Sequence, residues 1–96
     1  MKASLKEMHG MHTVDLLQQA LDLARRAGYT IRQEWLGGNG GGGCELKGRK
    51  IFFLDLALGP ADQFDQLIET LRYDPQAMGL PMPYQLRDLL ALRKSA

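Results

Sequence analysis

The residues of this chain with the clearest capacity for chemistry lie in one stretch, "EWLGGNGGGGCELKGR", residues 34–49. Six of the seven residues from Gly37 to Gly43 are glycine, and the only cysteine of the chain follows them. Glycine lets a ligand approach the backbone closely, and exposed backbone N–H groups can cradle an anion. The stretch therefore suggests a ligand-binding loop that uses Gly38, Gly40, Gly41, Gly42 and Gly43, with Cys44, Trp35 and Asp55 nearby.

Two phosphate-binding motifs can be tested against this stretch. Gly38, Gly40 and Gly43 match the spacing G-x-G-x-x-G, but a dinucleotide site also needs a helix directly after the glycines. Here the chain continues as "CELKGRKIFF", which is typical of strands joined by a turn. The phosphate loop G-x-x-x-x-G-K-[ST] is absent from the sequence. The sequence thus predicts no cofactor.

The competing hypothesis is that the glycine run is a hairpin loop between two strands. A turn centred on Gly38 and Asn39 places Trp35 against the bare backbone of Gly42. A turn centred on Asn39 and Gly40 has more favourable turn residues, but it places Glu34 directly opposite Glu45, and like charges in that position are unfavourable. Charge pairing favours the first register, and a longer loop is the remaining alternative.

Cys44 and Asp55 are the other candidates for chemistry. A catalytic thiol needs a histidine nearby, but the only histidines, His9 and His12, lie near the N-terminus and lack a third metal ligand. We therefore predict that Cys44 is a small buried apolar residue and that no metal is bound. Asp55 ends an apolar strand, and a carboxylate there needs a partner. We expect it to accept hydrogen bonds from backbone N–H groups in the turn before Gly59, and Arg72 and Tyr73 are the other possible partners. The alternative is a poised acid at the edge of the sheet. The sequence contains no complete catalytic set, which favours a protein without enzymatic activity.

Composition disfavours several classes of function. The 96 residues are 45% hydrophobic and 24% charged, which is typical of one folded domain. The formal net charge of +1 disfavours nucleic acid as a partner. No apolar run reaches the ~20 residues of a membrane-spanning helix, and no secretory signal is recognisable. The single cysteine cannot form an intramolecular disulfide. Together these features predict a cytoplasmic protein without a membrane partner.

Hydrophobic periodicity predicts the elements that position these residues. We expect a flexible tail over residues 1–11 and a single domain over residues 12–96. Helices are expected to begin at Val14, Pro60 and Tyr84, with an irregular linker over residues 75–83. Strands are expected over residues 29–36, 44–46 and 50–56, with a tight turn at Lys47–Gly48 or Gly48–Arg49. The order α-β-β-β-α-α predicts an α+β fold, a three-stranded antiparallel meander packed on helices.

The third expected strand, "KIFFLDL", is apolar on both faces. Ile51 and Phe53 point to one side, and Phe52 and Leu54 point to the other. One face is expected to pack on helices, and the other needs the last helix or a second subunit. The interface candidates are Phe52, Leu54, Met78, Leu80 and Met82. We therefore predict a non-catalytic protein-interaction module that binds itself as a homodimer, or binds another protein. The alternative is a small-ligand binder or enzyme that uses the glycine-rich loop 37–43 with Cys44 and Asp55.

One segment, Lys50–Tyr73, resembles part of the ImmA/IrrE family of minimal zinc peptidases. In that family an apolar strand leads into an L-S-P-x-E-Q-like helix start, which residues 58–63, "LGPADQ", resemble. The family's helix then carries H-E-x-x-H, whose histidine positions fall here on Glu69 and Tyr73 and whose general base falls on Thr70. None of these residues can serve in those roles. The resemblance covers about a quarter of the chain, and it implies a related scaffold without the zinc and peptidase chemistry.

Overall fold

A three-stranded sheet and the helices on one side of it make up the part of the chain that the structure describes. The computed structural model describes residues 10–94 and the side chains of residues 12–91. The elements in chain order are α2 (Gly10–Arg26), β1 (Tyr29–Glu34), β2 (Gly42–Leu46), β3 (Arg49–Asp55), α3 (Pro60–Arg72), α4 (Pro75–Met78) and α5 (Tyr84–Lys94). The predicted α+β class and element order are therefore confirmed.

The strand order corrects one part of the prediction, because the sheet is not an antiparallel meander. The order is β1-β3-β2, with β1 parallel to β3 and β2 antiparallel to β3. β3 is the most apolar strand, and the central position lets both of its edges pair within the sheet. Both hairpin registers predicted for β1 and β2 are wrong, since these strands lie on opposite sides of β3. The tight turn at Lys47–Gly48 between β2 and β3 is present, with positive φ at both residues.

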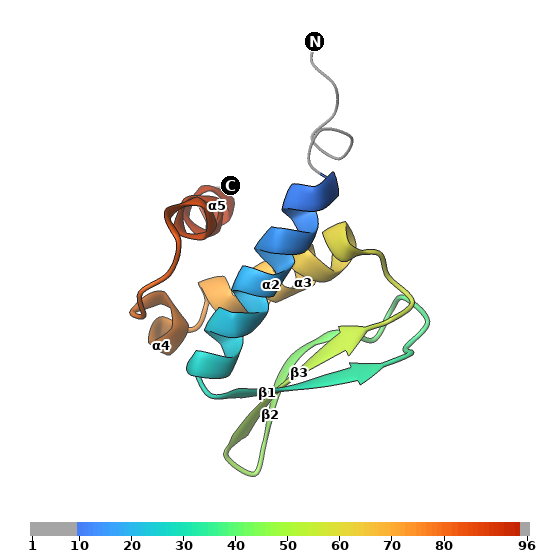
Figure 1. Cartoon of the computed structure of the whole chain (residues 1–96). Helices are drawn as coiled ribbons and strands as arrows, with labels where there is room; N and C mark the ends of the chain where they lie inside the picture. The colour runs from blue at the N-terminus through green and yellow to red at the C-terminus, as the bar shows by residue number, and fades with distance from the viewer. Residues whose placement is uncertain (1–9, 95–96) are drawn as a thin grey trace.

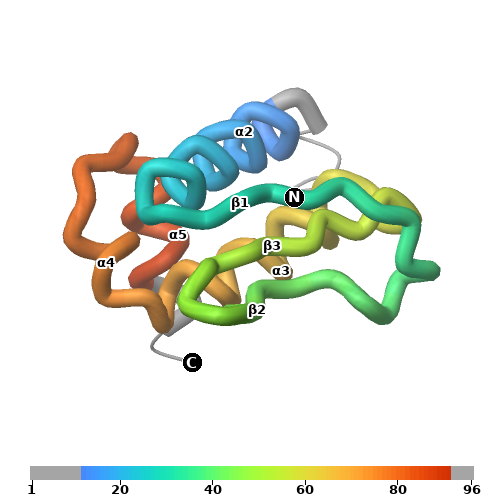
Figure 2. Tube along the Cα trace, turned by 90° about the horizontal axis from the view of Figure 1, so that it is seen from below, coloured from blue at the N-terminus to red at the C-terminus, as the bar shows by residue number. Residues whose placement is uncertain are grey.

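The helices cover one face of the sheet only. α2 and α3 lie above the strands in Figure 1, and α4 and α5 lie to one side. Figure 2, seen from below, shows β1, β3 and β2 side by side with α2 and α3 behind them. Phe52 and Leu54 of β3 are buried in the core beneath the helices, together with Leu67 and Leu71 of α3. Side chains alternate along a strand, so Ile51 and Phe53 lie on the opposite, open face of the sheet.

Two helix boundaries differ from the prediction. α2 begins at Gly10 rather than Val14, so Gly10 and Met11 of the predicted tail are helical. The rest of that tail, residues 1–9, lies outside the described residues. Part of the predicted linker forms the short helix α4, whose start is capped by Asp74 through the N–H groups of Gln76 and Ala77. Asp followed by Pro is a common helix start, and this signal was present in the sequence.

Candidate functional site

The glycine-rich segment crosses the end of β3, where it covers Asp55. The Asp55 side chain is fully buried. Its Oδ1 accepts hydrogen bonds from the N–H groups of Leu36 and Ala57, both at 2.9 Å, and its Oδ2 accepts one from Gly38 at 2.7 Å. The N–H group of Gly40 also bonds to this carboxylate. The bond from Ala57 confirms the predicted role in the turn before Gly59, and the other three fasten the glycine loop.

These bonds control the charge of Asp55. Burial by itself raises the pKa of a carboxyl group, because it disfavours the charged form. Here the N–H groups of Ala57, Leu36, Gly38 and Gly40 outweigh burial and lower the pKa of Asp55 below its ordinary value of 3.8. The carboxylate is therefore charged at neutral pH and saturated with donors, and the N–H groups that bind it are not open to a ligand.

The glycines after Asn39 allow a close approach between β2 and α3. A Cβ atom at Gly43 would lie 2.6 Å from Cγ2 of Thr70, which real side chains do not tolerate. A Cβ atom at Gly41 would collide with Oε1 of Gln66. Both Thr70 and Gln66 belong to α3, so these glycines let the helix pack directly on the backbone of β2 and of the residue just before it.

The structure does not bring the predicted ligand-loop residues together. Cys44 is exposed, so its predicted burial is wrong. It pairs with Ile51 across β2 and β3 and lies on the open face, whereas Gly43 faces the helices. Trp35 is 74% exposed rather than packed on Gly42, because β1 does not pair with β2. Asp55 is fully buried beneath the loop, so it shares no exposed surface with Trp35.

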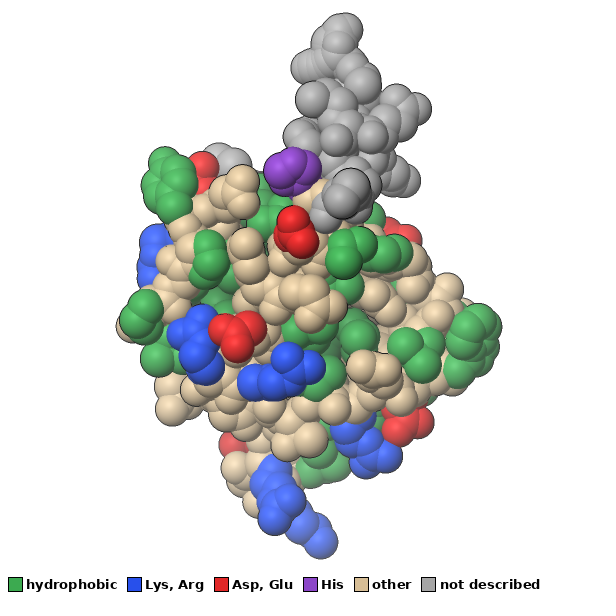
Figure 3. Space-filling view, in the orientation of Figure 1, with side chains coloured by type: hydrophobic (Ala, Val, Ile, Leu, Met, Phe, Trp, Pro, Cys, Tyr) green, Lys and Arg blue, Asp and Glu red, His purple; other side chains and the backbone are tan. Residues whose placement is uncertain are grey.

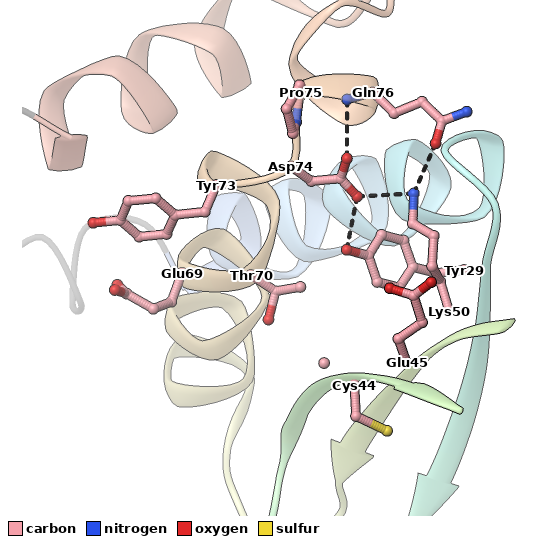
Figure 4. A pocket seen from close by; sticks show the side chains of 11 residues that line it. Tyr29, Cys44, Glu45, Lys50, Glu69, Thr70, Tyr73, Asp74, Pro75 and Gln76 are labelled. Atoms are coloured by element: carbon pink, nitrogen blue, oxygen red, sulfur yellow. Dashed lines mark hydrogen bonds and ion pairs between the residues drawn. The ribbon is translucent and has the colours of Figure 1, made fainter. Parts of the chain in front are cut away.

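A groove of about 580 Å³ lies on the helix side, between β2, the end of α3 and the start of α4. Its polar centre is a cluster of side chains that the sequence analysis did not identify as a site, shown in Figure 4. Asp74 Oδ2 accepts a hydrogen bond from the Tyr29 hydroxyl at 2.8 Å and pairs with Lys50 Nζ at 2.9 Å. The cysteine at the rim of the groove points away from this cluster (Figure 4).

The Lys50 ammonium group is fully used within the protein. Besides Asp74 it donates to the carbonyl of Ala27 at 2.7 Å and to Oε1 of Gln76 at 3.0 Å, which matches its three N–H donors. It also lies 4.7 Å from the centroid of the Tyr29 ring. The cluster thus joins the end of α2, both parallel strands and the start of α4.

The pKa values in this cluster follow from burial and from the ion pair. Burial raises the pKa of Tyr29, and its hydrogen bond to the Asp74 carboxylate raises it further. Burial also acts to raise the pKa of Asp74, but the bonds from Lys50, from Tyr29 and from the backbone of α4 lower it below 3.8. At neutral pH the cluster is therefore a fixed ion pair with a neutral tyrosine, and it supplies neither a free base nor a free nucleophile.

The open face of the sheet differs from the predicted interface. Phe52 and Leu54, predicted as interface residues, are 0% and 5% exposed. The other three candidates, Met78, Leu80 and Met82, are partly buried and pack against the core. The residues that face outward are instead Ile51 and Phe53, which are half-buried, with Leu46 and Cys44 beside them on β2. The prediction of which residues of β3 share a face is therefore confirmed, but the prediction that Phe52 and Leu54 lie on the exposed face is wrong.

Among the described residues, positive and negative side chains are mixed on the surface and do not form a large patch of one charge. On the open face the Arg32 guanidinium pairs with Glu34 at 2.9 Å and lies 5.8 Å from the centroid of the Phe53 ring. On the face seen in Figure 3, blue and red side chains are interspersed.

Within residues 10–94 no helix is long and apolar enough to cross a membrane. In the same part of the chain no three side chains of His, Cys, Asp or Glu lie close enough to hold a metal ion.

Comparison with known proteins adds no relative from which a function could be transferred. No protein-family model, no curated protein and no solved structure matches this chain.

Proposed function

We propose that this protein is a non-catalytic protein-interaction module that works as a homodimer through its three-stranded sheet. The observation that carries the proposal is that helices cover only one face of the sheet. On the other face Ile51 and Phe53 are half-buried, and Leu46 is 55% exposed. A second copy that lies against the sheet would remove part of these apolar side chains from water, which is favourable.

The groups with catalytic potential support a binding role, because they are engaged in holding the fold. Both oxygens of Asp55 accept backbone hydrogen bonds, and Asp74 and Lys50 neutralise each other. The free thiol of Cys44 lies on the exposed side of the sheet, and an unpaired exposed thiol suits a reducing compartment. We therefore also propose that the module works in the cytoplasm.

The test is the mass of the protein in solution, by native mass spectrometry and by light scattering across a dilution series. The wild-type chain is expected at twice its monomer mass of 10.7 kDa. Leu46→Lys, which places a charge on the exposed side of β2, is expected to shift the population toward the monomer. Val14→Lys is the matched control, since Val14 is 44% exposed on α2, and it should leave the dimer intact. A wild-type protein that is monomeric throughout the series would contradict the proposal.

A further inference from the structure

The outer edge of β2 has no strand beside it and lacks the features that usually shield such an edge. β2 is an edge strand, and its four residues from Gly43 to Leu46 are all exposed. Exposed edges are usually protected from pairing by lysine, proline or several charges. Within β2 the only charge is that of Glu45, and there is no proline. The other edge strand, β1, carries both Arg32 and Glu34.

The turn after β2 determines which backbone groups lie free on this edge. Lys47 and Gly48 have φ values of 52° and 78°, as a two-residue type I′ turn requires. In such a turn the carbonyl of the residue before it accepts from the N–H of the residue after it, so Leu46 and Arg49 form a hydrogen-bonded pair. Bonded and non-bonded pairs alternate along an antiparallel ladder. The N–H and C=O groups of Gly43 and Glu45 therefore point away from β3, toward the free edge.

We propose that β2 pairs antiparallel with β2 of a second copy, around a twofold axis at Cys44. This inference rests on the proposed function and specifies the contact that forms the dimer. With the axis at Cys44, the whole of β2 pairs, and Gly43 and Glu45 of one copy exchange hydrogen bonds with Glu45 and Gly43 of the second copy.

The charges and side-chain sizes of β2 select this register. An axis at Glu45 would set two Glu45 carboxylates opposite each other, which is unfavourable. An axis at Gly43 would pair only residues 42–44 within the strands. With the axis at Cys44, Glu45 lies opposite a glycine, and Leu46 lies opposite Gly42 of the second copy. Large side chains opposite glycines fit without a clash.

The pairing creates one six-stranded sheet from two copies. A twofold axis perpendicular to the sheet keeps the helices of both copies on the same side, so the two open faces join into one surface. The exposed Leu46 side chains then lie near the junction on that surface. On the helix side, the edge of the second copy borders the groove that contains Glu45, so each groove is completed by both copies.

The test uses the cysteine at the axis as a reporter. In a non-bonded antiparallel pair the two Cα atoms lie about 4.5 Å apart, which is within the range of a disulfide. Treatment of the full-length chain with diamide, which accepts the two electrons and two protons lost by two thiols, should give a covalent dimer through Cys44. The matched control is Thr30→Cys in a Cys44→Ser background, because Thr30 is exposed on the same face but on the far strand. We expect cross-linking of Cys44 to be at least about tenfold faster than that of the control, because pairing holds the two thiols together.

A second pair of variants tests the register without oxidation. Cys44→Lys sets two ammonium groups opposite each other at the axis and should weaken dimerisation roughly tenfold. Cys44→Ser should leave it unchanged. A wild-type dimer that neither cross-links at Cys44 nor responds to Cys44→Lys would overturn the edge pairing but leave the proposed function standing. A protein that is monomeric throughout would overturn both.

Discussion

The Asp55 carboxylate and the backbone N–H of Gly38 are joined by a 2.7 Å hydrogen bond that spans 17 residues of sequence. This bond ties the loop between β1 and β2 to the end of the central strand. The loop has to cross that end, because β1 and β2 pair with opposite edges of β3. A buried carboxylate at the crossing supplies acceptors for backbone N–H groups that the sheet leaves unpaired.

Replacing the charge of Asp55 should loosen the loop. In Asp55→Asn an NH₂ group replaces one of the two carboxylate oxygens. This group cannot accept hydrogen bonds, so it would face backbone N–H donors and leave them without an acceptor. We expect the melting temperature, followed by circular dichroism, to fall by roughly 5–10 °C. Amide exchange at Leu36 and Gly38 should accelerate. Asp88→Asn, at an exposed position of α5, is the control and should have little effect. Unchanged exchange in Asp55→Asn would mean that the carboxylate does not hold the loop.

Acid should destabilise the protein through Asp55 and Asp74. The pKa values of both carboxyl groups are lowered below 3.8 in the folded state, so the unfolded chain binds their protons at higher pH than the folded one. Their contribution to stability is therefore complete above the ordinary pKa and is lost as the pH falls through the folded-state values. Urea unfolding from about pH 7 to about pH 2 should show this loss. The stability difference between wild type and Asp55→Asn should shrink over the same range, and a constant difference would contradict the assignment.

The contact of Gly43 with Thr70 can be tested by a double-mutant cycle. Gly43→Ala alone should lower the free energy of unfolding by about 1–3 kcal/mol, because the new methyl group meets Cγ2 of Thr70 at 2.6 Å. Thr70→Ser removes that Cγ2 atom and keeps the hydroxyl that donates to the Gln66 carbonyl. In the double variant most of the loss should be recovered. If the two effects simply add, β2 and α3 do not approach through this glycine.

The ion pair of Lys50 with Asp74 should contribute to stability. Lys50→Met keeps the length of the side chain but leaves Asp74 without its cation. The two side chains are only 22% and 12% exposed, so we expect a loss of about 2 kcal/mol, less than for a fully buried pair. Chemical denaturation measures the loss. Arg49→Met, at an exposed position at the start of β3, is the control and should change stability far less. Equal effects of the two substitutions would mean that the network adds nothing beyond surface charge.

Local features of the chain were predictable because local physics fixes them. The helix that begins at Pro60 starts where proline favours a first helical turn, and the Lys47–Gly48 turn follows from a glycine between two strand-like segments. The bond from Ala57 to Asp55 spans only two residues, so a buried carboxylate at a strand end was enough to predict it. The bonds from Leu36 and Gly38 were not predictable, because they depend on where the next strand lies.

The class of fold, the order of helices and strands and the two-sided character of β3 were predictable from the amino-acid sequence, since they follow from periodicity within short segments. Three features depend on the folded arrangement of the elements: β3 lies between β1 and β2, Phe52 rather than Phe53 is buried, and Cys44 is exposed. Alternation along a strand separates its two faces but does not say which face the helices cover. That choice depends on how α2 and α3 pack across the sheet, and it is made by contacts between residues far apart in the chain.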